Sequence, residues 1–149
     1  MFESANLKHH VDKAAYKREA GKLRQALLDA QYDLKQNGRF PVLILVAGVE
    51  GAGKSETVNL LNEWMDPRHI LTSAFFAPSD EARERPALWR FWRALPPKGK
   101  IGIFFGAWHT HPIVQRAMGR IRDGEFAAAI GEIQRLERML CNEGVLLLK

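Results

Sequence analysis

One stretch of the chain, VLILVAGVEGAGKSET at residues 42–57, constrains the fold more than any other. Its apolar run predicts a buried strand, its glycines predict a tight turn, and its Lys-Ser pair predicts the start of a helix. The spacing Gly-four residues-Gly-Lys-Ser/Thr of a P-loop is met, in the strand-turn-helix context that this motif requires. The matching residues are Gly48, Gly53, Lys54 and Ser55. An ordinary glycine turn requires neither that spacing nor that context, so we expect a phosphate-binding loop.

The residue types of this loop explain how it would bind phosphate. Its glycines let the backbone adopt conformations that a Cβ disfavours, so successive N–H groups can surround a phosphate. The helix that follows adds the partial positive charge of its N-terminus. Lys54 would bind the outer phosphates, and the Ser55 hydroxyl would ligate Mg²⁺. The predicted phosphate-binding residues of the loop are Gly48, Gly51, Ala52, Gly53, Lys54 and Ser55.

Composition limits the class of protein. A chain of 149 residues with 46% hydrophobic and 26% charged residues is typical of one globular domain. No apolar run approaches the ~20 residues that span a bilayer, and the N-terminus has no signal-peptide core. We therefore expect a cytoplasmic protein that does not bind membranes. The net charge of +5 favours a polyanionic partner, although charge alone does not choose among nucleotides, polyphosphate and nucleic acid.

The order of apolar segments predicts the fold class. Residues 1–38 read as an N-terminal helical segment with helical spacing over 7–36, which Gly21 could divide, and residues 39–149 read as the core. The basic residues of the first segment form either a solvated face or a guide for a long anion. In the core, strands are predicted at 42–46, 70–77, 100–105 and 145–149, and helices at 54–65, 86–95, 112–122 and 125–142. This alternation predicts a three-layer α/β/α fold with a parallel sheet.

Three further features carry candidate sites. The helix at 86–95 interleaves aromatic residues with arginines, so it either packs a core or grips phosphates and bases, and Arg90 is the candidate ligand. Cys141, the single cysteine, excludes an internal disulfide and is expected to be buried on its helix. His109 and His111 could share one face of an extended segment, but zinc needs a third protein ligand that is not evident.

Three stretches resemble the polyphosphate kinase 2 family: GVEGAGKSETVNLLNEWMDPRHI, PSDEARERPALWRFWRALPPKGKIGIF and NEGVLLLK. The likeness is strongest to the amino-terminal domain of the tandem-domain, polyphosphate:AMP phosphotransferase type. The resemblance implies a P-loop kinase fold similar to thymidylate kinase, and phosphoryl transfer between inorganic polyphosphate and nucleotides with Mg²⁺. It also implies that the lid and the last helices lie beyond Lys149, so that this chain is an incomplete core.

The resemblance implies roles for particular residues. Glu50 stands where the family has an Asp in the P-loop, so Lys54 and Glu50 are the candidate catalytic residues, and Ser55 and Glu50 the candidate Mg²⁺ ligands. After the third strand the family has Asp or Asn, Arg, Ser, Trp, Tyr. This chain has Phe105, Gly106, Ala107, Trp108 and His109 there. The acidic metal ligand and the arginine are absent, which predicts a degenerate domain that binds phosphate, with His109 in the place of the Tyr.

Three functions remain open from the sequence. The first is a polyphosphate-dependent nucleotide phosphotransferase, with polyphosphate and an AMP- or ADP-type nucleotide as partners, a second kinase-like domain, and assembly as a homo-oligomer. The second is a non-catalytic domain of the same protein, serving structure, dimerisation or polyphosphate binding. The third is an ATP-dependent nucleotide kinase, which a P-loop alone would allow. Nucleic acid is disfavoured because the positive charge is dispersed and no reading module is evident.

Overall fold

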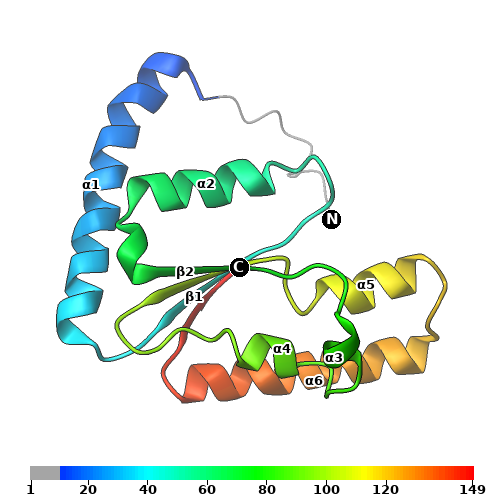
Figure 1. The fold of residues 1–149 in the computed structure, drawn as a ribbon. Helices are drawn as coiled ribbons and strands as arrows, with labels where there is room; N and C mark the ends of the chain where they lie inside the picture. The colour runs from blue at the N-terminus through cyan, green and yellow to red at the C-terminus, as the bar shows by residue number, and fades with distance from the viewer. Residues whose placement is uncertain (1–10) are drawn as a thin grey trace.

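Within residues 11–149, which the computed structural model describes, four strands form one parallel sheet between two layers of helices (Figure 1). The strand order is β2 (Ile70–Ala74), β3 (Ile101–Phe105), β1 (Val42–Val46) and β4 (Leu146–Leu148). β3 pairs with both β1 and β2, and β1 also pairs with β4. The predicted three-layer α/β class with a parallel sheet is confirmed.

The helices divide between the two faces of the sheet (Figure 1). One face is covered by α1 (Lys13–Asn37) and α2 (Lys54–Trp64), and a short 3-10 turn, η2 (Pro67–His69), leads from α2 into β2. The other face is covered by α3 (Asp80–Arg83), α4 (Trp89–Trp92), α5 (Thr110–Ala117) and α6 (Asp123–Asn142). No helix among the described residues is both long and apolar enough to cross a membrane.

Two hydrophobic clusters, one on each face, hold the layers together. Side chains alternate across a strand, so Leu43 and Phe104 face α4 and α6, whereas Ile103 faces α1 and α2. These three side chains are fully buried. Because both faces of each central strand are covered, the strands read in sequence as continuous apolar runs rather than as alternating ones.

The first helix is a single continuous element. α1 is continuous across Gly21, so this glycine does not divide the helix, the alternative that the sequence left open. The Asp12 side chain caps its start by accepting from the N–H groups of Ala14 and Ala15, and Gly38 ends it with a φ of 56°. The start expected near Leu7 lies outside the described residues. Leu34 joins the core cluster on the α2 face, and the division of the chain at residue 38 stays a prediction.

Several boundaries after β1 differ from the prediction. β2 ends at Ala74 rather than at 77, and the helix expected at 86–95 is reduced to the single turn α4. Ser79 caps α3, which lies between the predicted strand at 70–77 and the predicted helix at 86–95. α5 ends at Ala117 rather than at 122. Cys141 is exposed, so its predicted burial is wrong, because α6 buries its 133, 136 and 140 positions and turns the next position outward.

Candidate functional site

The P-loop lies at the carboxyl edge of the sheet, where β1 ends and α2 begins. β1 is a central strand with neighbours on both sides, so the loop is anchored in the most constrained part of the sheet. Gly51 and Gly53 both have a φ of 78°, in the left-handed region that residues with a Cβ rarely adopt. Gly53 is the N-cap of α2, so these two positions require glycine for the turn to form.

The backbone amides of the loop are available to an anion. Among the N–H groups from Val49 to Ser55, that of Ala52 is the one with a backbone acceptor in the described part of the chain, the Val49 carbonyl at 3.3 Å. The N–H groups at 53–55 belong to the N-cap and the first turn of α2, where a helix leaves its donors unsatisfied and carries partial positive charge. The loop therefore presents a group of unpaired donors of the kind that bind phosphate.

Lys54 holds its ammonium group over the same loop. Its Nζ donates a hydrogen bond of 2.6 Å to the Val49 carbonyl. This bond fixes the position of the charge next to the amides rather than letting it extend into solvent. A phosphate oxygen bound to the amides would therefore meet a cation that is already in place.

A cavity of about 580 Å³ opens at this loop. It is lined by Glu50, Gly51, Gly53, Lys54, Ser55, Glu56, Phe76 and Phe105. Five of the predicted site residues therefore share one cavity, whereas Gly48 and Ala52 belong to the loop but do not line it. Sequence reasoning missed Glu56 and Phe76. The position of Glu56 in the first helical turn after the Lys-Ser pair would have indicated the former, but nothing local indicates Phe76.

The oxygen donors of the cavity fit Mg²⁺. The Ser55 hydroxyl and the carboxylates of Glu50 and Glu56 line it together, and Mg²⁺ is typically bound by one or two carboxylates plus water and substrate phosphate oxygens. Within the described residues, no group of three or more His, Cys, Asp or Glu side chains is arranged as a metal site. The donor set therefore suits a cation that arrives with a phosphate group rather than one held by the protein alone.

The end of β3 forms an apolar wall of this cavity. Phe105 faces Phe76 with ring centroids 6.5 Å apart. Gly106 has a φ of 81°, and a Cβ there would lie 2.7 Å from the Phe75 carbonyl oxygen. Ala107 is 3% exposed in the core. An arginine at position 106 would therefore require a shift of the backbone. A single substitution at this position would not restore the positive charge without changing the local fold.

The two histidines that follow do not converge. His109 Nε2 lies 3.0 Å from Glu137 Oε1, and the carboxylate also accepts from Trp108 Nε1 at 2.9 Å and from Lys149 Nζ at 2.6 Å. Burial lowers the pKa of His109 despite the attraction of Glu137. Burial would raise the pKa of Glu137, but its hydrogen bonds from Lys149 and Trp108 outweigh this and lower it. Glu137 thus fixes the segment after β3, and His111 lines a different cavity.

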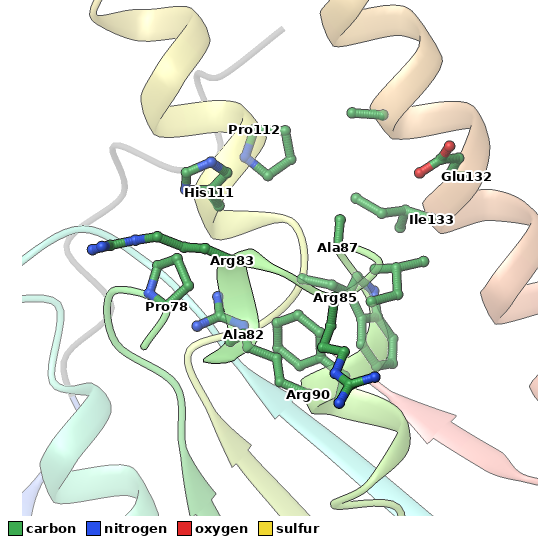
Figure 2. A pocket seen from close by; sticks show the side chains of 14 residues that line it. Pro78, Ala82, Arg83, Arg85, Ala87, Arg90, His111, Pro112, Glu132 and Ile133 are labelled. Atoms are coloured by element: carbon green, nitrogen blue, oxygen red, sulfur yellow. The ribbon is translucent and has the colours of Figure 1, made fainter. Parts of the chain in front are cut away.

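Arg90 does not line the P-loop cavity. Its Nη1 donates to the Phe76 carbonyl at 2.7 Å, and its guanidinium lies 4.9 Å from the centroid of the Phe91 ring. Burial lowers its pKa. With Arg83 and Arg85 it borders a separate cavity of about 310 Å³ (Figure 2). The inner wall of that cavity is apolar and includes the buried side chains of Phe91, Trp108 and Ile133.

Comparison with known proteins places this geometry in a family. The sequence pattern described as Polyphosphate kinase 2 (PPK2) matches residues 10–149. The chain is 56% identical over 149 residues to "Polyphosphate:AMP phosphotransferase" of Pseudomonas aeruginosa and 46% identical to the protein of that name in Pseudomonas syringae. Each alignment covers 100% of this chain and 30% of the relative. The chain thus spans about a third of the length of these relatives.

Two solved structures have the same fold as this chain. A crystal structure from Pseudomonas aeruginosa PA01 superposes with a TM-score of 0.94 at 56% identity, covering 99% of this chain and 32% of that one. Polyphosphate kinase 2 from Arthrobacter aurescens TC1 superposes with a TM-score of 0.91 at 24% identity, covering 99% of this chain and 56% of that one, and shows the shared fold. The resemblance read from the three sequence stretches is confirmed: the chain belongs to the polyphosphate kinase 2 family.

Proposed function

We propose that the chain is a phosphate-binding domain of a polyphosphate-dependent nucleotide phosphotransferase, acting on inorganic polyphosphate and an AMP- or ADP-type nucleotide. The observation that carries this proposal is the set of unpaired loop amides beside Lys54, in a cavity of about 580 Å³. The names of the relatives support the substrate class. A second kinase-like domain and a homo-oligomer belong to the same proposal.

The residues of the cavity have distinct parts in this proposal. The amides and Lys54 bind the phosphate oxygens, and Glu50 and Ser55 would hold Mg²⁺. When bound, Mg²⁺ supplies charge neutralisation for the phosphate oxygens. Phosphoryl transfer passes through a loose transition state, so the protein contributes position and charge rather than covalent chemistry. Each of these side chains therefore acts by lowering the electrostatic cost of holding phosphate groups together.

A second candidate, binding without turnover, is favoured by the apolar wall after β3. By the resemblance, Phe105 and Gly106 stand where the family has a carboxylate and an arginine, and Gly106 occupies a conformation that favours glycine. Removing one charge-stabilising group from such a site costs on the order of 10³-fold in rate. We propose that this domain binds its phosphate ligand and contributes little turnover of its own.

Calorimetric titration with magnesium tripolyphosphate tests the proposal. Lys54→Ala is expected to weaken binding about tenfold or more, as the loss of a charge-assisted hydrogen bond does. Lys98→Ala is the matched control, because Lys98 precedes β3 and lies at the amino edge of the sheet, opposite the P-loop. Equal affinity of the Lys54→Ala and wild-type chains would overturn the proposal. A parallel titration with ATP separates a preference for polyphosphate from a preference for nucleoside triphosphates.

A further inference from the structure

We propose that Arg85, Arg90 and Arg93, here called the Trp89 arginine cluster, bind the part of a polyphosphate chain that extends beyond the P-loop. The inference rests on the proposed function, because the chain must first be anchored at Lys54. It assigns a role to the aromatic and basic residues around α4, which the P-loop cavity does not use. It also predicts that the length of the phosphate chain determines its affinity.

The three guanidiniums are held in place by aromatic rings and a carbonyl. Those of Arg85 and Arg93 lie 5.6 Å and 4.8 Å from the centroid of the Trp89 ring. Arg90 is fixed by its bond to the Phe76 carbonyl. Stacked and hydrogen-bonded arginines lose little side-chain freedom when they bind a ligand. The cluster is therefore preorganised, unlike a set of freely moving surface arginines.

The cluster adjoins the P-loop cavity through shared walls. Phe76 lines both the P-loop cavity and a neighbouring cavity of about 420 Å³, which Trp89, Arg90 and Arg93 also line. Arg90 in turn borders the cavity of Figure 2, together with Arg85. The segment that connects β2 to α4 thus lines three adjoining cavities, of which the first contains Lys54. A linear polyanion anchored at the P-loop can follow this surface.

The chemistry of the cluster favours bare phosphate groups over nucleic acid. Guanidinium groups bind phosphate oxygens through paired N–H donors. The Trp89 ring already contacts the guanidiniums of Arg85 and Arg93, so a base that stacked on it would compete with them. Glu81 lines the 420 Å³ cavity and Glu132 lines the 310 Å³ cavity, so the three guanidiniums of the cluster exceed the carboxylates of these two cavities by one. Arg83 is excluded from the cluster because it pairs with Asp80 at 2.8 Å.

Calorimetry with phosphate chains of two lengths tests the inference. Arg93→Ala is expected to weaken the binding of long-chain polyphosphate about fivefold, the effect of losing one exposed ion pair. It should also reduce the slope of log K against log salt by roughly 0.7, the value for one contact to a single-stranded polyanion. Binding of magnesium tripolyphosphate should not change. Arg138→Ala, an exposed arginine of α6 that lines none of these three cavities, should change neither titration.

Three results would overturn the inference. One is an unchanged affinity of Arg93→Ala and Arg85→Ala for long-chain polyphosphate. Another is an equal loss for tripolyphosphate and long chains, which would reduce the cluster to support of the P-loop. The third is a single-stranded RNA that binds as tightly as long-chain polyphosphate and is weakened equally by Arg93→Ala. A failure of the proposed function gives a different result: Lys54→Ala would then leave the binding of tripolyphosphate unchanged.

Discussion

At the scale of single residues, Gly106 determines what the site after β3 can contain. Its N–H donates to the Val46 carbonyl at 2.9 Å, which ties this residue to the strand that leads into the P-loop. The positive φ and the close Phe75 carbonyl leave no room for a side chain. Restoring the arginine of the family at this position would therefore disturb the backbone beside the phosphate cavity. A single substitution at position 106 would therefore not convert the apolar wall into a charged one without disturbing the fold.

We expect Gly106→Ala to destabilise the fold by about 3 kcal/mol. A left-handed conformation costs a residue with a Cβ roughly 1–2 kcal/mol, and overpacking adds about as much again. Gly119→Ala is the matched control, because Gly119 has a φ of 67° but nothing within 4 Å of an added Cβ. Its cost should be only the roughly 1–2 kcal/mol of conformational strain. Urea unfolding measures both, and equal losses would show that the Phe75 contact has no effect.

Residue spacing predicted part of the site and not the rest. The P-loop was recognisable because its residues are local in sequence and fixed in order, so Glu50, Gly51, Gly53, Lys54 and Ser55 meet in one cavity as expected. Phe76 joins them only through the parallel pairing of β2 and β3, which no local pattern encodes. The predicted role of Arg90 in binding phosphate remains a proposal, now attached to a neighbouring cavity.

At the scale of elements, α1 carries a glycine in its interior. Gly21 lies within the continuous helix, and nothing lies within 4 Å of a Cβ added there. Gly21→Ala should therefore raise the free energy of unfolding by roughly 0.5–1 kcal/mol, because alanine loses less backbone freedom in a helix. Urea unfolding tests this. A loss of stability would contradict the open surroundings of Gly21.

Glu137 joins three elements: α6, the segment after β3, and the end of β4. It is half-buried and accepts from Trp108 and Lys149 while contacting His109. Its lowered pKa means that the unfolded state binds a proton first as the pH falls below 4.5. Its contribution to stability is therefore present above that pH and is lost as the pH falls through the folded-state pKa.

We expect His109 to make stability depend on pH at a higher range. Its folded-state pKa lies below 6.5. As the pH falls below 6.5, the unfolded state takes up a proton that the folded state resists, so the free energy of unfolding decreases. His109→Gln should flatten this dependence just below pH 6.5. Urea titrations at several pH values test this, and an unchanged slope for His109→Gln would contradict it.

Elements were predictable in proportion to how far local pattern determines them. The strands were found because each is an apolar run bounded by turn residues, and α6 because its spacing is regular. The segment at 86–95 was misread as one helix. Phe91 is 3% exposed and packs against Phe104 and Trp108, and Arg90 bonds to a carbonyl, so tertiary contacts rather than helical propensity fix this stretch.

At the scale of the whole molecule, the sheet brings the P-loop, which we propose binds phosphate, next to the apolar wall that contains Phe105. The P-loop lies at the end of β1, and the apolar wall at the end of its neighbour β3. Because relatives are about three times as long as this chain, activity in the whole protein can depend on residues outside it. We therefore expect this chain to bind phosphate and to have low turnover of its own.

We expect this chain to transfer phosphate from polyphosphate to AMP on the order of 10³-fold more slowly than a family member with the carboxylate and arginine after β3. The physical reason is that, by the resemblance, this chain lacks one cation and one metal ligand after β3. A coupled assay of ADP formation at saturating polyphosphate and AMP measures this. Comparable rates would show that other residues replace those two groups.

The most direct test of the central claim is amide NMR of the isotope-labelled chain during titration with magnesium tripolyphosphate. The P-loop account predicts that the largest shift changes occur at the amides of residues 49–55, in the downfield direction of new hydrogen bonds to phosphate, and that Lys54→Ala moves them to higher ligand concentration. Unchanged amides in that loop, with shifts centred on other parts of the chain, would contradict it.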